Sequence, residues 1–410
     1  MTRITLPADA HREHILRCVR ENRVTIIQGE TGCGKSSRVP LILLESVVGA
    51  KMMVAQPRRI AVKGLHQRAE QEGVGHLVGM RMGGGIRDEG RQTRMWLVTT
   101  GYLVRLASGK PAAFRDHTHL IIDECHERSL DSDVLCLMAR RLLVQHPHLR
   151  LVLMSATVHT EILADYFGEE VGRSHVGRPL FVGSRRFKLT ECYLKEITSY
   201  IPQNAHGNRK KLEQLIDVAA QMIKTTSQGR RPGRPQSITS MISEAQLKLA
   251  ASLATALIKE KKIGDNSSGG GAILMFISGI TDIEILSDAF SKVPACMTLP
   301  IHSDLPFEEQ LNIFEPAAGM TKVYLATNAA ESSLTLPDVD VVIDLGAHKQ
   351  VLYDEERKVT RLVKTWISKA SATQRAGRTA RVRPGTVFRL YTQKLFAVLM
   401  RVNEIPTALV

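Results

Sequence analysis

The chain has 410 residues, 43% of them hydrophobic, which is long and apolar enough for two packed domains. It carries 55 lysines and arginines against 41 acidic residues; the net charge of +14 favours a polyanionic partner such as nucleic acid, although a uniformly solvated basic surface is the alternative. The six cysteines form no CxxC pair, and no apolar run approaches the roughly 18 residues of a membrane span. We therefore expect an intracellular protein of a reducing compartment, cytoplasmic or nuclear with mitochondrial import left open, and no membrane partner.

Short apolar runs alternate with helical stretches along the chain and predict two series of buried parallel strands. The first series comprises residues 24–28, 52–55, 95–100, 120–123 and 149–154. The second series follows Pro179 and comprises residues 273–277, 297–301, 323–326, 339–344 and 387–391. Two tandem α/β units follow, placed at residues 1–182 and 183–393, with residues 394–410 as the start of a further C-terminal region.

Two segments of the second unit interrupt this alternation. Residues 199–240 carry polar and basic clusters with little strand pattern, so part of this segment is expected to be a mobile insertion. Residues 264–271 are rich in glycine and serine and are expected to form a surface loop before the next strand.

A phosphate-binding pattern, GETGCGKS, runs from Gly29 to Ser36 between the first strand and a predicted helix. Its glycines let backbone N–H groups turn toward phosphate oxygens, Lys35 can reach the outer phosphates, and the Ser36 hydroxyl can bind Mg²⁺. The residues predicted to contact a nucleotide here are Gly29, Thr31, Gly32, Gly34, Lys35, Ser36 and Ser37.

A second motif, Asp123-Glu124-Cys125-His126, ends the apolar strand at residues 120–122. Its two carboxylates would project from the carboxyl end of the sheet, near the phosphates. We assign Asp123 to Mg²⁺ and Glu124 to orienting and deprotonating the attacking water, with a place beside the metal as well.

With these two motifs in place, the chain resembles the DEAH/RHA group of superfamily 2 RNA helicases, and the match runs through nearly its whole length. Seven further segments carry the resemblance in order: 56–59 (QPRR), 99–101 (TTG), 155–157 (SAT), 276–279 (FISG), 302–303 (HS), 326–335 (ATNAAESSLT) and 374–381 (QRAGRTAR). The resemblance implies two RecA-like P-loop domains, each a mostly parallel sheet flanked by helices.

The resemblance also implies catalytic roles for residues of both halves. Gln374, Arg378 and Arg381 would face the γ-phosphate from the second domain, where arginine neutralises charge in the transition state. His126 joins the catalytic group, and Ser155 and Thr157 would couple the nucleotide to the nucleic-acid strand. Hydrolysis would then release the two domains from one another.

Nucleic acid is expected across both domains, held by phosphates and sugars without sequence preference. The matching positions are Arg58, Arg59, Thr100, Gly101, Ser278, Gly279, Thr327 and Asn328. Arg68 and Phe314 would stack on the nucleobase, with Asp338 as a further nucleotide contact, so weak discrimination among nucleoside triphosphates is expected.

Some positions depart from the family pattern or extend it. Ala380 replaces a usual glycine, Pro337 replaces a usual acidic residue, and residues 82–85 break a usually aromatic strand, which suggests slow or regulated turnover. Residues 353–363 resemble a strand-separating β-hairpin.

The function expected from the resemblance is an ATP- and Mg²⁺-dependent RNA helicase or translocase that binds single-stranded RNA, with use of other nucleoside triphosphates left open. A ribonucleoprotein particle or an activating protein is a candidate partner. Two alternatives stay open: a ribonucleoprotein (for example ribosome) assembly factor with weak or no hydrolysis, and a DNA translocase.

Overall fold

The computed structural model describes residues 5–30, 32–127, 129–156, 160–183, 187–200, 206–227, 237–260, 271–315, 317, 319–331, 336, 338–354 and 358–400. The chain divides into two compact units, unit 1 up to Arg186 and unit 2 from Phe187 onward. The boundary expected from the sequence lies four residues earlier, between residues 182 and 183. Each unit has its own sheet and its own core.

Unit 1 is built on an eight-stranded sheet in the order β4-β3-β5-β2-β6-β7-β1-β8. The strands are β1 (Val24–Gln28), β2 (Met52–Gln56), β3 (Val78–Arg81), β4 (Arg87–Asp88), β5 (Met95–Thr99), β6 (His119–Ile122), β7 (Arg150–Ser155) and β8 (Leu180–Phe181). Every neighbouring pair is parallel except β3 with β4. All five predicted strands of this half are present, and β3, β4 and β8 extend the sheet beyond them.

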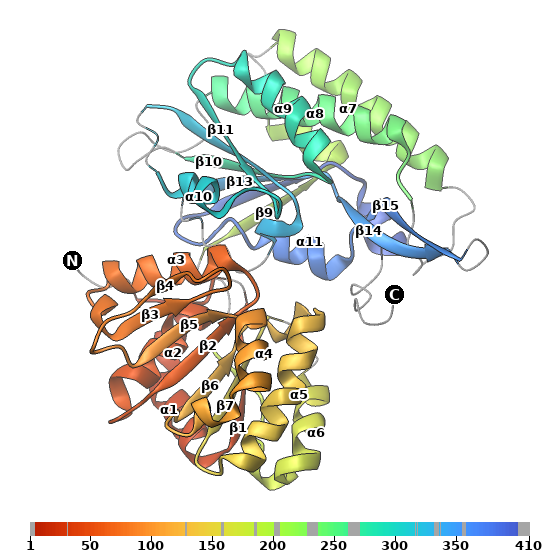
Figure 1. Cartoon of the computed structure of the whole chain (residues 1–410). Helices are drawn as coiled ribbons and strands as arrows, with labels where there is room; N and C mark the ends of the chain where they lie inside the picture. Colours follow the sequence, from red (N-terminus) through yellow and green to blue (C-terminus); the bar gives the residue numbers. More distant parts are fainter. Residues whose placement is uncertain are drawn as a thin grey trace. The chain divides into compact units, whose positions relative to one another are not determined.

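Two rows of helices flank this sheet. They are α1 (Arg12–Glu21), α2 (Lys35–Ser46), α3 (Arg59–Gln71), α4 (Thr100–Gly109), α5 (Leu130–Gln145) and α6 (Thr160–Val171). Helix α2 packs between α1 and α3, whereas α5 packs between α4 and α6, and Figure 1 shows the second row side by side. Because both faces are covered, the central strands are buried almost continuously, as their apolar runs predict.

Unit 2 is built on a six-stranded, fully parallel sheet in the order β11-β12-β10-β13-β16-β9. The strands are β9 (Leu189–Tyr193), β10 (Ala272–Phe276), β11 (Cys296–Ile301), β12 (Thr321–Ala326), β13 (Val339–Asp344) and β16 (Gly385–Arg389). Strand β16 begins and ends two residues before the predicted run, and β9 was not predicted. Two α/β units with mostly parallel sheets are thus confirmed.

The helices of unit 2 include one inside the expected insertion. They are α7 (His206–Ser227), α8 (Ser240–Lys259), α9 (Ile280–Ser291), α10 (Phe307–Gln310) and α11 (Lys369–Ala376). Helix α7 lies within residues 199–240, where part of the segment was expected to be mobile, and it packs on α8 (Figure 1). Its buried Leu212, Ile216, Ala219 and Ile223 recur at helical spacing and join the core, which explains why this stretch is ordered. The basic cluster at 229–235 and the glycine-rich stretch 264–270 lie outside the described residues.

Helix α8 is long and apolar enough, with a mean hydropathy of 1.2, to meet the length and composition of a membrane span. The sequence shows no uninterrupted apolar run here because Glu244, Gln246 and Lys248 lie within the helix. More than half of α8 is buried, and its apolar side chains belong to the core of unit 2. It is therefore a core helix of this unit.

A two-stranded antiparallel ribbon extends from the sheet of unit 2. Strands β14 (Ala347–Asp354) and β15 (Val359–Trp366) pair along their full length (Figure 1). The β-hairpin expected around residues 353–363 is confirmed, and it begins earlier in the chain than the sequence suggests.

Candidate functional site

The carboxyl edge of the unit 1 sheet gathers three of the sequence motifs. Strands β1, β7 and β6 are neighbours, with Gln28 opposite Ser155 and Ile122 opposite Leu153. The phosphate-binding loop follows β1, Asp123 follows β6, and Ala156 follows β7. Ligands of parallel α/β sheets bind at this edge, outside the carboxyl ends of the strands.

The phosphate-binding loop has the backbone that its glycines were expected to provide. Gly32 and Gly34 adopt φ angles of +91° and +95°, which a residue with a side chain rarely adopts. A Cβ at Gly34 would also lie 2.8 Å from Leu6 Cδ1. Gly34 is the N-cap residue of α2, so the loop runs into a helix N-terminus, where backbone N–H groups favour a bound anion. Thr31 lies outside the described residues.

Lys35 and Glu124 form an ion pair. Both residues are buried, and the Lys35 Nζ lies 3.5 Å from Glu124 Oε2. Glu124 has a φ of +52°, an unusual value for a residue with a side chain and one that often marks a functional site. The structure therefore places the proposed phosphate lysine and the proposed catalytic base side by side.

Asp123 is a buried carboxylate with several donors. Gln56 Nε2 donates to its Oδ2 at 2.8 Å, the Glu124 backbone N–H donates to its Oδ1 at 2.8 Å, and Ser36 also hydrogen-bonds it. Burial raises the pKa of Asp123, and the charge of Glu124 adds to this, whereas Lys35, Ser36 and Gln56 oppose it. A hydroxyl and a carboxylate side by side supply the oxygen ligands that Mg²⁺ prefers, so these residues fit the expected metal.

His126 connects the Asp123–His126 motif to the end of β7. The Ala156 backbone N–H donates to His126 Nδ1 at 3.3 Å, so Nδ1 is the acceptor in this contact. The same Nδ1 lies 3.5 Å from Glu124 Oε2. Ser155 contributes through its carbonyl, which accepts from the Gly29 N–H at 3.1 Å. Thr157, the other expected coupling residue, lies outside the described residues.

The expected RNA contacts of unit 1 follow two adjacent strands. Strands β2 and β5 pair with Gln56 opposite Thr99, so α3 and α4 begin at the same sheet edge as the phosphate site. Arg59 is exposed at the start of α3, and Arg58 Nη2 lies 3.8 Å from Glu127 Oε2. Thr100 is buried. Gly101 is the neighbour of Asp131, whose Oδ2 would lie 2.9 Å from an added Cβ.

The expected RNA contacts of unit 2 also share one sheet edge. Ser278 follows β10 and Thr327 follows β12, in adjacent strands that pair with Phe276 opposite Ala326. The buried Ser278 hydroxyl donates to the Asp282 carboxylate. That carboxylate also binds Lys364 of the β14–β15 ribbon at 2.9 Å. Asn328 is exposed, and Gly279 lies against Lys349, whose Cε would be 2.9 Å from an added Cβ.

The proposed catalytic arginines lie in the turn that follows α11. Arg378 Nε donates to the Gln374 carbonyl at 3.4 Å, and Arg381 Nε donates to the Gly377 carbonyl at 3.2 Å. Ala380 has a φ of +57°, so it adopts the left-handed conformation suited to the usual glycine. The departure at this position therefore preserves the turn.

Two buried residues that the sequence did not assign hold this turn in place. The Thr379 hydroxyl lies 2.9 Å from the carbonyls of both Val339 and Asp340. Arg375 is fully buried, with Nε 3.2 Å from Glu331 and Nη1 2.9 Å from Asp344. These contacts tie α11 and the turn to β13 and its neighbours.

The expected nucleobase contacts lie in both units. In unit 1, Arg68 Nε donates to Glu72 at 3.1 Å. In unit 2, Asp338 accepts from the Tyr324 hydroxyl at 3.0 Å and lies 3.5 Å from Lys322 Nζ. The Tyr324 hydroxyl also lies 3.3 Å from the carbonyl of Ile313, the residue before Phe314. Asp338 therefore lies close to the backbone of this segment. The side chain of Phe314 lies outside the described part of the chain.

Sequence reasoning missed several residues of these sites, namely Gln56, Ala156, Thr379 and Arg375. Each lies within a motif segment, so the motif itself was the available signal. Ala156 acts through its backbone N–H, which every residue type except proline provides, and so its side chain gives no indication of the role.

Comparison with known proteins agrees with this geometry. The family model described as "DEAD/DEAH box helicase" matches residues 9–165, and the model described as "Helicase conserved C-terminal domain" matches residues 252–383. Together they match more than two thirds of the chain.

Three relatives illustrate the similarity. A putative DEAH-box ATP-dependent helicase of Mycosarcoma maydis is 34% identical over 99% of this chain and 28% of its own length. The DExH-box ATP-dependent RNA helicase DExH1 of Arabidopsis thaliana is 32% identical over 95% of this chain and 41% of its own. The crystal structure of the Escherichia coli DEAH/RHA helicase HrpB superposes with a TM-score of 0.70 at 25% identity, covering 98% of this chain and 44% of that one.

The chain thus spans less than half the length of these relatives. The two helicase models match in the order of the two units, and the similarity to each relative extends over nearly all of the chain. This chain therefore belongs to the DEAD/DEAH-box helicases, in the DExH/DEAH (DEAH/RHA) group of RNA helicases.

Proposed function

We propose that this chain is an RNA-dependent ATPase that uses hydrolysis to translocate on or unwind RNA. The observation that carries the proposal is the convergence of Lys35, Ser36, Asp123 and Glu124 at one sheet edge. The relatives DExH1 and DHX30 are named ATP-dependent RNA helicases, which supports both the nucleotide and the nucleic acid.

Each residue has a distinct role in the proposed reaction. The loop N–H groups and Lys35 hold the phosphates, and Glu124 orients the attacking water and accepts its proton. Mg²⁺, held by Ser36 and Asp123, would offset negative charge on the phosphate oxygens. Lys35 and Glu124 are 3.5 Å apart, so phosphate bound to the lysine would lie within reach of a water on the glutamate.

We further propose that Gln374, Arg378 and Arg381 of unit 2 act on the same triphosphate. The turn pinned by Thr379 would hold the two guanidinium groups ready to offset the charge that develops in the transition state. Single-stranded RNA would bind at the sheet edges that carry Arg58 and Arg59 in unit 1 and Thr327 and Asn328 in unit 2.

Steady-state ATP hydrolysis with and without single-stranded RNA tests this function. We expect RNA to stimulate turnover, and we expect Glu124→Gln to reduce RNA-stimulated kcat by about 10² or more, because a positioned general base contributes at least this factor. The matched control is Glu45→Gln, which removes a carboxylate at the opposite end of α2.

The alternatives give different results in the same assay. Turnover that ignores RNA would contradict the coupling, and stronger stimulation by single-stranded DNA would indicate a DNA translocase. Wild-type protein that binds RNA with ATP turnover no higher than that of Glu124→Gln would indicate an assembly factor.

A further inference from the structure

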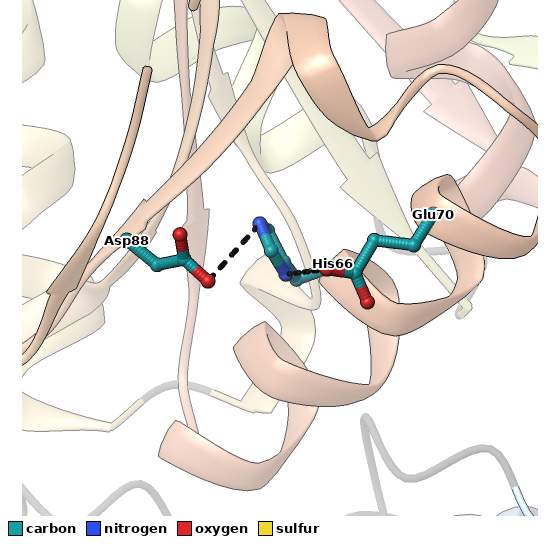
Figure 2. A group of neighbouring side chains, drawn as sticks. All are labelled: His66, Glu70 and Asp88. Carbon is teal, nitrogen blue, oxygen red and sulfur yellow. Dashed lines mark ion pairs between the residues drawn. The ribbon is translucent and has the colours of Figure 1, made fainter.

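A second cluster of ligand-type side chains lies in unit 1, outside the proposed ATP site. His66 and Glu70 lie one turn apart on α3, and Asp88 lies on the edge strand β4. Figure 2 shows the imidazole between the two carboxylates. One donor atom from each of the three residues lies within 4.8 Å of the others.

The histidine is buried and has one nitrogen committed. Its Nε2 lies 3.2 Å from the Val78 carbonyl, which can only accept, so Nε2 carries the ring proton. In the neutral imidazole, which is the form that binds a metal, Nδ1 then carries the lone pair. It is buried, has no hydrogen-bond partner among the described residues, and lies 3.6 Å from Glu70 Oε1.

This arrangement is typical of a metal-binding histidine. Such a histidine usually donates its second ring N–H to a backbone carbonyl or a carboxylate, which fixes the tautomer and turns the other nitrogen toward the metal. Zinc bonds of about 2.1 Å place tetrahedral donors about 3.4 Å apart, so the 3.6 Å between Nδ1 and Oε1 needs only a small adjustment.

Asp88 lies on the other side of the ring from Glu70 (Figure 2), with its Oδ2 4.0 Å from Nε2. Its side chain is 55% exposed, and its carboxylate would have to turn toward Nδ1 to bind the same ion. Two glycines bring the chain close to the carboxylate residues. A Cβ at Gly75 would lie 2.9 Å from Glu70 Cγ, and one at Gly79 would lie 2.9 Å from the Asp88 carbonyl.

We propose that His66, Glu70 and Asp88 bind a divalent transition metal of the Zn²⁺ type, with water completing the coordination. One imidazole and two carboxylates suit Zn²⁺ better than Mg²⁺, which favours all-oxygen sites. The bound ion would tie α3 to the β3–β4 edge, and α3 begins with the Arg58-Arg59 pair. The proposal is independent of ATP hydrolysis.

Isothermal titration calorimetry of the full, chelator-stripped chain at neutral pH with ZnCl₂, and separately with MgCl₂, tests the site. We expect one Zn²⁺ site and no matching response to Mg²⁺. Glu70→Gln and Asp88→Asn should each weaken that site about tenfold or more, because even loss of an outer-shell partner costs tenfold. Both side chains are more than half exposed, so these variants should fold.

Glu13→Gln and Asp116→Asn, at exposed carboxylates elsewhere in unit 1, are the matched controls and should leave the affinity unchanged. Substitution with Co²⁺ adds a spectroscopic test: visible d–d bands without thiolate-to-cobalt charge transfer support the His/carboxylate site.

Three outcomes would overturn the proposal. They are equal Zn²⁺ affinity in wild type and both carboxylate variants, thiolate charge-transfer bands that assign the ion to a cysteine, and no Zn²⁺ binding at all. The last outcome would leave the cluster as polar contacts between His66 and the two carboxylates, without a metal.

Discussion

Ala380 illustrates how one residue can depart from a family pattern without losing its conformation. Its φ of +57° lies in the left-handed region, where a side chain costs about 1–2 kcal/mol. The hydroxyl of the preceding Thr379, bonded to carbonyls at the start of β13, holds the turn in this conformation. Gly385 leaves room for the Thr379 hydroxyl, because a Cβ added at Gly385 would lie 2.0 Å from Thr379 Oγ1.

We predict that Ala380→Gly stabilises unit 2 by up to about 1 kcal/mol, after subtracting the greater freedom of glycine in the unfolded chain. Thr379→Val should destabilise it by about 1–2 kcal/mol, because buried carbonyls lose a donor, and Thr379→Ser should restore most of the loss. Urea unfolding followed by circular dichroism measures both changes. Destabilisation by Ala380→Gly would show that the methyl group packs usefully in this turn.

His119, the first residue of β6, should make unit 1 sensitive to acid. Burial, with the nearby Arg150, lowers the pKa of His119 from 6.5 to about 4, so the unfolded chain takes up a proton before the folded chain does. The contribution to stability is full above about pH 6.5 and is lost progressively as the pH falls toward 4.

At pH 5 the lowered pKa of His119 should make the free energy of unfolding about 2 kcal/mol smaller than at pH 7. Urea midpoints at pH 7 and pH 5 test the prediction. His119→Gln should lose less stability across that interval than wild type, and the exposed His14→Gln should behave like wild type. An identical loss in His119→Gln would show that other groups set the acid response.

The side chains of the unit 1 site could be largely proposed from the sequence, because the phosphate loop and the Asp123–His126 motif each combine a distinctive spacing with a preceding apolar strand. Contacts that depend on the folded geometry could not be proposed from the sequence. The Gln56 bond to Asp123 joins residues 67 positions apart, and the Ala156 N–H bond to His126 uses a backbone atom. The His66 cluster spans α3 and an edge strand too short and polar to predict.

At the scale of elements, the central strands could be predicted from the sequence because they are buried on both faces and their residues are nearly all apolar. Strand β9 was missed because Leu189–Tyr193 alternates only weakly and lies at the sheet edge. Helix α7 was missed because the polar, basic run at residues 208–211 drew attention away from the helical spacing of the apolar residues that follow it.

One polar side chain of α8 bonds to the unit 2 sheet, in addition to the apolar packing of this helix. The buried Gln246 Nε2 donates to the Leu345 carbonyl at 2.9 Å and to the Leu390 carbonyl at 2.6 Å, at the ends of β13 and β16. Gln246→Leu should destabilise unit 2 by about 1–3 kcal/mol, because two buried carbonyls lose their donor.

Gln221→Leu on the exposed side of α7 is the matched control and should change stability by less than about 0.5 kcal/mol. Hydrogen exchange at the backbone amides of α8 reports the unfolding of unit 2 and distinguishes the two variants. Equal stability of both would mean that apolar packing alone positions α8.

For the whole molecule, the chemistry expected of one ATPase is divided between the two units. Unit 1 carries the phosphate loop, Asp123 and Glu124, whereas unit 2 carries Arg378 and Arg381 in a pinned turn. If one triphosphate requires both sets, removal of the arginines should slow hydrolysis far more than it weakens ATP binding, because they act on charge that develops in the transition state.

RNA-stimulated kcat of Arg378→Ala and Arg381→Ala, measured beside the ATP dissociation constant, tests this claim most directly. We predict a fall in kcat of about 10³ or more with ATP binding within a few-fold of wild type, while the exposed Lys292→Ala changes neither. A kcat within a few-fold of wild type in both arginine variants would contradict the account, because unit 1 would then hydrolyse ATP without the arginines of unit 2.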